Sequence, residues 1–399
     1  MSSAPEFPAL FTLRASRFVL RDSVLSGGSM VVRDGRIVAI GPADRIEAEG
    51  EVFHFPGEVW PGLVDLHVHG AGGCDFMDAR RESFDTILSI HAAGGTTSLL
   101  PTTVTAALPD IQNCLKALAG YKAERNGGVR LLGAHIEGPW LAPTRPGVHQ
   151  VSLLHPPTID ELDAMESAGF PLRIVTLAPE LAGACAFVRE LRGRGILASA
   201  GHSDAWLSDA EAAFAAGVSR TTHTFNCMSS ARKRGPLREP GLVEWALTEP
   251  GVVCEVIADG AHVAPALLKM LVRCKGAAGI SIISDATAAC GYPEGQVFLL
   301  GGQECVVENG LCLTADRQTL AGSPVTMFES VHNMEQLADV PRVEAVRMAS
   351  YNAAEALDLT AEVGSLTAGT NADFLLLDEQ DQLLATYVSG TRIHPKFAI

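Results

Sequence analysis

The chain of 399 residues is long enough for one large α/β barrel with an appendage, or for two or three smaller domains. Hydrophobic residues make up 47% of it and charged residues 19%, which argues against intrinsic disorder and leaves ample material for a core. The formal net charge of −16 argues against a general binder of nucleic acid or anionic membrane, so an anionic substrate would need a local basic cluster.

The compartment follows from the cysteines and from the N-terminus. The nine cysteines are scattered, with no C-x-x-C pair and no regular spacing, so we expect reduced thiols rather than a disulfide framework. The stretch MSSAPEFPALFTLRAS lacks the basic start and the unbroken apolar run of a signal peptide. No segment offers ~18 consecutive apolar residues, the length that spans a membrane. These features predict a cytoplasmic protein.

The two ends of the chain share a β-rich texture. The N-terminal part contains FTLRASRFVL, SMVVRDGRIVAIG and EVFHFPG, and the RDG inside the second run is typical of a hairpin. Near the C-terminus, ADFLLLDEQDQLLATYVSGTRI indicates two or more strands joined by an acidic turn. We therefore predict that residues 1–60 and 360–399 form one small β-sandwich domain.

Between these ends, apolar runs alternate with helix-like stretches. The strand candidates are residues 62–69, 96–104, 129–138, 172–180, 196–202, 220–226, 252–262 and 279–286. The helix candidates are residues 83–94, 110–124, 184–195, 207–217 and 264–277. This alternation implies a parallel sheet, and eight strands fit a (β/α)8 barrel over residues 61–359. The alternative is a doubly wound open sheet, but no G-x-G-x-x-G follows any strand.

In such a barrel the functional site lies at the carboxyl ends of the strands. The first strand ends in PGLVDLHVHG, where the period of two points His67 and His69 the same way. Two histidines at one strand end are, by themselves, more often hydrogen-bonded surface residues than metal ligands. The later strands decide between these interpretations.

Residues with metal-binding or proton-transfer chemistry follow most of the later strands. They are Glu137 in HIEGP, His202 in GHS, His223 in THTFN, His262 in ADGAH and Asp285 in SDA. Each has an ordinary explanation when taken alone: a lone histidine is usually a satisfied polar residue, Asp285 could cap a helix, and Asp259 could form an Asx-turn. Together with His67 and His69 these residues number seven, and all seven lie on one rim. Seven separate ordinary explanations would have to hold at once, which favours a shared site.

Histidines and carboxylates in this number are typical ligands of zinc, iron or another borderline first-row metal. They exceed what one tetrahedral ion needs, and two ions that share a carboxylate would account for the surplus. His67 and His69 are then expected to hold one of the ions.

The chain resembles the amidohydrolase superfamily in three features: PGLVDLHVHG, the β-rich N-terminus and the closing GSLTAGTNADFLLLD. Further motifs are similar to those of the N-acetylglucosamine-6-phosphate deacetylases within it. They are HIEGPWL with GVH shortly after, GHSDA, THTFNCM with REPGL downstream, and ISDATAACG followed by LAGS. The resemblance covers nearly the whole chain, and its specificity comes from the combination.

The resemblance implies a metal site for each group of matching residues. Glu137, His202 and His223 match the family's main metal site. His67 and His69 match a second site, which some members keep and others lose. We therefore expect two divalent ions per subunit, zinc or iron, with Glu137 bridging them.

The resemblance also implies the reaction and its residues. Asp285 matches the catalytic acid/base and is counted among the metal ligands, while His262 would donate to the developing oxyanion. The implied substrate contacts are His149, His262, Asn226, the backbone at Cys227, and Arg238, the last three at the phosphate. In the family that arginine reaches the neighbouring subunit's site, which implies a homodimer. The implied activity releases acetate from a phosphorylated N-acetyl amino sugar.

One segment departs from the family. The connection SSARKRGPL between FNCM and REPGL is longer than expected and carries Arg232, Lys233 and Arg234. It is either a solvated charged loop or extra cationic charge near the anionic end of the substrate.

Three other functions stay open. The first is deacetylation of the galacto isomer, the second is another amidohydrolase reaction that opens a cyclic amide or deaminates a base, and the third is an inactive scaffold of the same fold. The second usually needs a bridging lysine that no matching strand end supplies, and the intact ligand set disfavours the third.

Overall fold

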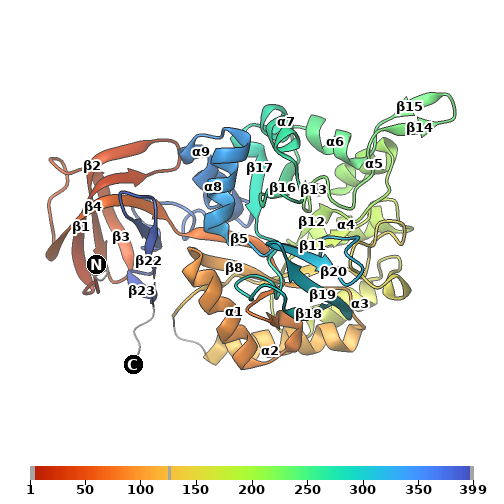
Figure 1. Ribbon diagram of the computed structural model, residues 1–399, viewed down its shortest axis with the longest axis horizontal. Helices are drawn as coiled ribbons and strands as arrows, with labels where there is room; N and C mark the ends of the chain where they lie inside the picture. Colours follow the sequence, from red (N-terminus) through yellow and green to blue (C-terminus); the bar gives the residue numbers. More distant parts are fainter. Residues whose placement is uncertain (1–4, 125–126, 396–399) are drawn as a thin grey trace.

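The computed structural model describes residues 5–124 and 127–395. It has two parts, a barrel with surrounding helices and a separate sheet at one side, and the first and last strands along the chain both belong to that sheet (Figure 1). The predicted fold class is therefore confirmed. Among the described residues, no helix has the length and apolar character needed to cross a membrane.

Eight parallel strands form the barrel. In chain order they are β5 (Leu63–Val68), β8 (Thr96–Thr103), β10 (Ala134–Glu137), β11 (Leu172–Leu177), β12 (Leu197–Ala200), β13 (Val218–Thr221), β16 (Val253–Ile257) and β17 (Ile280–Ile283). Each pairs with the next, and the short strand β9 (Arg130–Leu131) also pairs with β8. The ring closes less completely between β17 and β5, through a bridge between Val68 and Ala286 and a 3.0 Å hydrogen bond from Asp285 N–H to the His67 carbonyl.

One α-helix follows each barrel strand. These are α1 (Arg81–Ala93), α2 (Leu108–Glu124), α3 (Ile159–Glu166), α4 (Ala184–Gly193), α5 (Leu207–Ala216), α6 (Leu242–Thr248), α7 (Pro265–Lys275) and α8 (Met327–Ala338). The five predicted helices correspond to α1, α2, α4, α5 and α7. In α4 the buried residues Ala184, Phe187, Val188 and Leu191 repeat at helical spacing, which is why one face packs on the sheet.

The last two helices, α9 (Arg342–Met348) and α10 (Tyr351–Ala356), cover the amino end of the barrel. The Val64 N–H donates to the Ala349 carbonyl at 2.9 Å, and Ala353 packs with Val64 and Ile257 in the barrel interior. One end of the barrel is thus filled with apolar side chains, and the carboxyl end is left for chemistry.

The separate sheet contains seven strands. They are β1 (Leu10–Val19), β2 (Val24–Arg33), β3 (Arg36–Pro42), β4 (Glu51–Pro61), β21 (Phe374–Leu377), β22 (Leu383–Val388) and β23 (Thr391–His394), in the order β23-β22-β21-β4-β1-β2-β3. The predicted hairpin turn is present, because Asp34 and Gly35 both have positive φ (50° and 75°), as a type I′ turn requires. The sheet curls around a core of its own, and the Ala372 N–H donates to the Gly35 carbonyl at 2.8 Å. The exact domain boundaries at residues 60 and 360 stay a proposal.

Several smaller elements were not predicted. They are β6 (Gly70–Ala71), β7 (Cys74–Asp75), the hairpin β14 (Arg232–Arg234) and β15 (Leu237–Glu239), the three-stranded sheet β18 (Val297–Leu300), β19 (Gln303–Glu308) and β20 (Leu311–Thr314), and 3-10 turns at Phe76–Asp78, Val151–Leu153 and Ala277–Gly279. The β14–β15 hairpin projects from the barrel (Figure 1). The 3-10 turn at Ala277–Gly279 comes directly before β17, at the amino end of the barrel, and the other elements surround the carboxyl end or extend it.

Candidate metal centre

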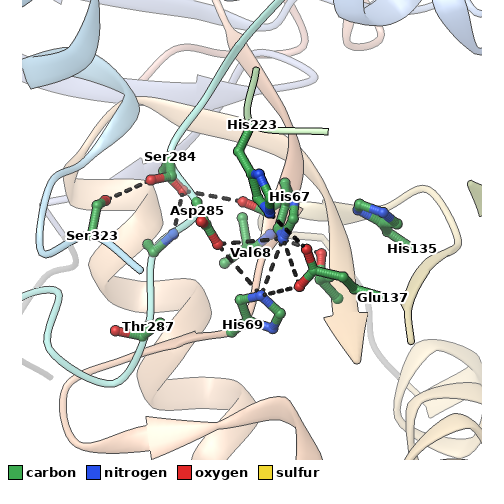
Figure 2. Close-up of polar contacts among 12 residues, drawn as sticks. His67, Val68, His69, His135, Glu137, His223, Ser284, Asp285, Thr287 and Ser323 are labelled. Carbon is green, nitrogen blue, oxygen red and sulfur yellow. Dashed lines mark hydrogen bonds and ion pairs between the residues drawn. The ribbon is translucent and has the colours of Figure 1, made fainter. Parts of the chain in front are cut away.

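The carboxyl ends of the barrel strands bring the predicted metal-binding residues together. His67 and His69 come from β5 and the residue after it, and Glu137 ends β10. His202, His223 and Asp285 lie just beyond β12, β13 and β17. All are buried. Figure 2 shows the part of this cluster around Glu137 and Asp285.

Glu137 lies at the centre of this cluster, and its two oxygens face different imidazoles. Oε2 is 3.4 Å from Nε2 of His67 and 3.1 Å from Nε2 of His69. Oε1 is 3.4 Å from Nε2 of His202 and 3.1 Å from Nε2 of His223. The two nitrogens within each pair are 3.1 and 3.0 Å apart, respectively. One carboxylate thus stands between two histidine pairs.

Asp285 completes the group around the first pair. Its Oδ1 is 3.3 Å from Nε2 of His67 and 3.4 Å from Nε2 of His69 (Figure 2). Its backbone is held on both sides, because its N–H donates to the His67 carbonyl and its carbonyl accepts from Ser323 N–H at 2.8 Å. His67, His69 and Asp285 therefore form one compact set of donor atoms.

The donor atoms fit a metal in both type and spacing. Ligand bonds of ~2.0 Å in a tetrahedron put the ligand atoms ~3.3 Å apart, and the distances within the two sets lie close to this value. Imidazole nitrogens with carboxylate oxygens are the ligands that zinc and iron prefer. The residues present therefore fit divalent metal.

The buried carboxylates of the cluster need positive charge beside them. Burial raises the pKa of Glu137, but the neighbouring His67 charge and the hydrogen bonds from the imidazoles outweigh it and hold this pKa well below its usual range. Burial also raises the pKa of Asp285, but the charges of His67 and His69 and the hydrogen bond from His69 outweigh it and lower this pKa below its usual value. Burial lowers the pKa of His69, yet its contacts with Asp285 and Glu137 raise it to about 10. The carboxylates stay anionic, and either protons on the imidazoles or a cation must balance them.

His149 faces the same carboxylate in a different role. Its Nε2 is 3.5 Å from Oε2 of Glu137, close enough to be grouped with Glu137 and His202 by distance alone. Its Nδ1, however, accepts from the Thr105 backbone N–H at 3.3 Å and lies 2.7 Å from the Thr105 hydroxyl, which can donate to it as well, so the neutral ring carries its proton on Nε2. Burial lowers the pKa of His149 to about 4, which keeps the ring neutral near pH 7. We conclude that His149 presents an N–H donor rather than a metal-binding lone pair.

His262 is oriented by Asp259. The His262 Nδ1 lies 2.6 Å from Oδ2 of Asp259, while Oδ1 accepts the backbone N–H groups of Ala261 and His262 at 2.9 and 2.8 Å. Asp259 therefore forms the expected Asx-turn and also holds the imidazole. Burial raises the pKa of Asp259, but the hydrogen bond from His262 outweighs it and lowers that pKa below its usual value. If Nε2 is to donate as well, the ring must be an imidazolium, whose charge Asp259 balances.

The cluster opens into a cavity of about 310 Å³. Its walls contain His69, Glu137, His149, His202, His223, Asn226, Cys227, His262 and Asp285, together with Leu300, Gln318, Thr319 and Leu320. His67 is fully buried behind this wall. Arg238 does not line the cavity of its own chain, because it is exposed on β15 in the projecting hairpin.

Three of the residues predicted for the metal site have a strained backbone. His202, His223 and Asp285 have φ values of 46°, 34° and 48°, in the left-handed region that side chains other than glycine adopt rarely. Each lies two residues beyond the end of a barrel strand, so the unusual φ turns the side chain toward the axis instead of continuing the strand. This conformation depends on tertiary contacts and has no sequence pattern of its own.

The side chains that support the metal site were not predicted. The His135 ring lies edge-on to His67 with 4.5 Å between ring centroids, and its Nε2 is 2.7 Å from the Thr176 hydroxyl. His135 and Glu137 stand two residues apart on β10, a period that could have identified His135 as facing the site. Thr105 and the second role of Asp259 had no comparable signal.

The chain is similar to known proteins along most of its length. The Amidohydrolase family profile matches residues 59–394. The chain belongs to the amidohydrolase family. The N-acetylglucosamine-6-phosphate deacetylase of Vibrio furnissii is 35% identical over 90% of this chain and 89% of that protein. The N-acetylgalactosamine-6-phosphate deacetylase of Escherichia coli is also 35% identical, over 95% of this chain and 98% of that protein.

A solved structure shares the whole architecture. It is a mutant of the N-acetyl-D-glucosamine-6-phosphate deacetylase from Mycobacterium smegmatis in complex with N-acetyl-D-glucosamine-6-phosphate. The TM-score is 0.88 at 33% identity, covering 97% of this chain and 100% of that one. This member of the amidohydrolase family therefore has relatives of the same fold along nearly its whole length.

We expect metal binding to release protons near neutral pH. Because the pKa of His69 is raised to about 10, its imidazole is protonated at pH 7 in the metal-free protein, whereas a metal binds only the neutral ring. Metal affinity should therefore rise as the pH rises toward the pKa of His69. Calorimetric titration with Co²⁺ in two buffers of different ionisation enthalpy measures the protons released per ion. A value near zero at pH 7 would contradict this charge balance.

Proposed function

We propose that this chain hydrolyses the N-acetyl amide of N-acetylglucosamine-6-phosphate to glucosamine-6-phosphate and acetate. The observation that carries the proposal is the arrangement of Glu137 between two histidine pairs, with Asp285 beside one pair and an open cavity in front. The relatives named above supply the substrate class. A hydrolase of a linear amide, acting in amino sugar metabolism, fits both.

Two divalent ions, zinc or iron, are proposed per subunit. His67 and His69 would hold one ion with Asp285 beside it, His202 and His223 would hold the other, and Glu137 would bridge the two. When bound, such a metal polarises the amide carbonyl and lowers the pKa of water from ~15.7 to about 7. The separate orientation of the two Glu137 oxygens supports the bridging role.

Asp285 is proposed as the proton carrier. Glu137 and Asp285 are the two carboxylates among the residues that line the cavity, and both Glu137 oxygens face imidazoles. The imidazole contacts of Asp285 use Oδ1, which leaves Oδ2 to take a proton from the attacking water and pass it to the leaving amine nitrogen. His262, held by Asp259, would donate from Nε2 to the carbonyl oxygen as negative charge develops there.

The substrate would be held at its other end by its phosphate. Asn226 and the backbone at Cys227, which lie on the cavity wall, are the proposed phosphate contacts, while His149 offers an N–H donor to the substrate beside Glu137. Arg238 is exposed on a projecting hairpin, and we propose that it reaches the cavity of a second subunit in a homodimer. All nine cysteines are unpaired, which supports a reducing, cytoplasmic location.

Metal content should reveal two sites. Protein saturated with Zn²⁺ is expected to hold close to two equivalents, and changing both His67 and His69 to Asn should lower this toward one, because the second pair around Glu137 remains. Elemental analysis after gel filtration measures the ratio. A wild-type value of one would defeat the binuclear proposal.

Asp285→Asn should keep the fold but turn over far more slowly. Loss of a general acid–base group costs about 10² to 10⁴ in rate, so kcat should fall by that factor or more. Circular dichroism and metal content must be measured on the same preparation, because a loss of metal would assign Asp285 to ligation instead. Near-normal turnover would show that another group carries the proton.

Substrate preference tests the function directly. Steady-state assays should compare N-acetylglucosamine-6-phosphate, its galacto isomer and the unphosphorylated sugar. Preference for the galacto isomer would select the second candidate, which the E. coli relative supports.

Arg238→Ala should lower kcat/KM about tenfold to a hundredfold for the phosphorylated sugar only, because a charge-assisted hydrogen bond is worth roughly 1.5 to 3 kcal/mol. Arg234→Ala in the same hairpin is the matched control. Equal effects on both sugars would refute a phosphate site at Arg238.

A further inference from the structure

Asp204, two residues after the metal-facing His202, joins two segments that lie far apart in the sequence. Its Oδ1 accepts Nε and Nη2 of Arg145 at 3.0 and 2.9 Å. The same oxygen contacts Nη1 of Arg232, and the Asp204 carbonyl accepts Nη2 of Arg232 at 2.7 Å. One short motif, GHSDA, thus holds a loop that flanks the cavity and the first strand of the projecting hairpin.

The first connection leads back to His202. Its Nδ1 lies 2.9 Å from the Arg145 carbonyl, which fixes the tautomer and turns the Nε2 lone pair toward Glu137. The matching Nδ1 atoms of His67, His69 and His223 are buried and have no hydrogen-bond partner within the described part of the chain. His202 is therefore the one member of the two pairs whose ring is oriented from behind by a hydrogen bond, and that acceptor is held through the Arg145 side chain.

The second connection leads to the hairpin. The Arg232 guanidinium lies 4.1 Å from the centroid of the Trp206 ring while it contacts Asp204. Arg234 lies 5.3 Å from the same ring, but its ion pair is with Glu239 inside the hairpin at 3.4 Å. Arg232 also stays outside the wall of the cavity. Of the three cations that set this segment apart from the family, Arg232 is thus an anchor rather than a solvated charge or a cavity cation.

We propose that Asp204 is a positioning residue that orients His202 through Arg145 and fixes the β14–β15 hairpin through Arg232. The first part rests on the proposed metal site at His202; the second part does not. Both connections meet on one carboxylate, so the metal centre and the base of the hairpin that carries Arg238 share a single anchor. The side chains of Arg145, Asp204 and Arg232 are 37%, 32% and 29% exposed, so each ion pair contributes little to global stability, and the effect should appear in local orientation.

The test uses four variants of the full chain: Asp204→Asn, Arg145→Ala, Arg232→Ala and the matched control Arg234→Ala. Binding of Co²⁺, followed by its visible absorption in competition with a chelator, measures metal affinity. Amide hydrogen exchange over residues 230–240, followed by mass spectrometry, measures the mobility of the hairpin. Circular dichroism and thermal unfolding confirm that each variant is folded.

The two readouts should separate the two connections. Asp204→Asn should weaken Co²⁺ binding by about 10- to 100-fold, the usual cost of losing an outer-shell partner, and should also speed exchange in the hairpin. Arg145→Ala should weaken Co²⁺ binding alone, Arg232→Ala should speed hairpin exchange alone, and Arg234→Ala should do neither.

Wild-type Co²⁺ affinity in both Asp204→Asn and Arg145→Ala would overturn the role at His202. Wild-type hairpin exchange in Arg232→Ala would overturn the role at the hairpin. If Asp204→Asn does not fold, the two arginine variants still test each connection separately. Neither readout uses a sugar, so a wild-type protein that fails to deacetylate any sugar phosphate would refute the proposed function and leave this test intact.

Discussion

The structure of the site depends on the neutralisation of buried negative charge. Glu137 is 2% exposed and Asp285 is 7% exposed, and in surroundings of low polarity an uncompensated carboxylate is far too costly to keep. Both remain anionic because imidazoles meet them from several strands. This single requirement fixes which strand ends must point at one another, and it leaves a cluster whose positive charge can come from protons or from metal but cannot be omitted.

The barrel meets that requirement at its least regular seam. Between β17 and β5 one bridge replaces a full strand ladder, and the buried Asp65 accepts the N–H groups of His67 and Ser284, each at 3.2 Å. The Ser284 hydroxyl donates to the same carboxylate. The Asp65 side chain thus supplements the single backbone bond from Asp285 N–H to the His67 carbonyl where these two residues must lie next to each other. An ordinary ladder there would keep Asp285 in strand conformation and deny it the φ of 48° that turns it inward.

Periodicity explains what the sequence could predict. Alternation and the apolar runs identify all eight barrel strands, and because parallel strands end on one rim, residues such as Glu137, His202 and His223 could be assigned to a common site. The helices α3 and α6 span only eight and seven residues, too few to show a clear period. The strands β18–β20 and the helix α8 are as long as elements that were predicted, but they follow the eighth barrel strand, where the regular alternation of strand and helix is interrupted. The left-handed backbone, the proton position on His149 and the partner of Arg232 depend on contacts across the fold. Local pattern contains no information about them.

The cavity wall has two kinds of part, which come from different segments of the chain and have different roles. The barrel ends supply the imidazoles and carboxylates, whose positions are tied to one another by charge and tolerate little change. Much of the remaining wall lies outside the barrel strands, including Asn226, Cys227 and the segment around Gln318, Thr319 and Leu320. The two candidate sugars differ only in the configuration of one hydroxyl group, which a metal centre acting on the amide has no means to sense. Selection between them must therefore be made by these outer segments, and a change of sugar preference within this fold requires no change in the metal-binding residues.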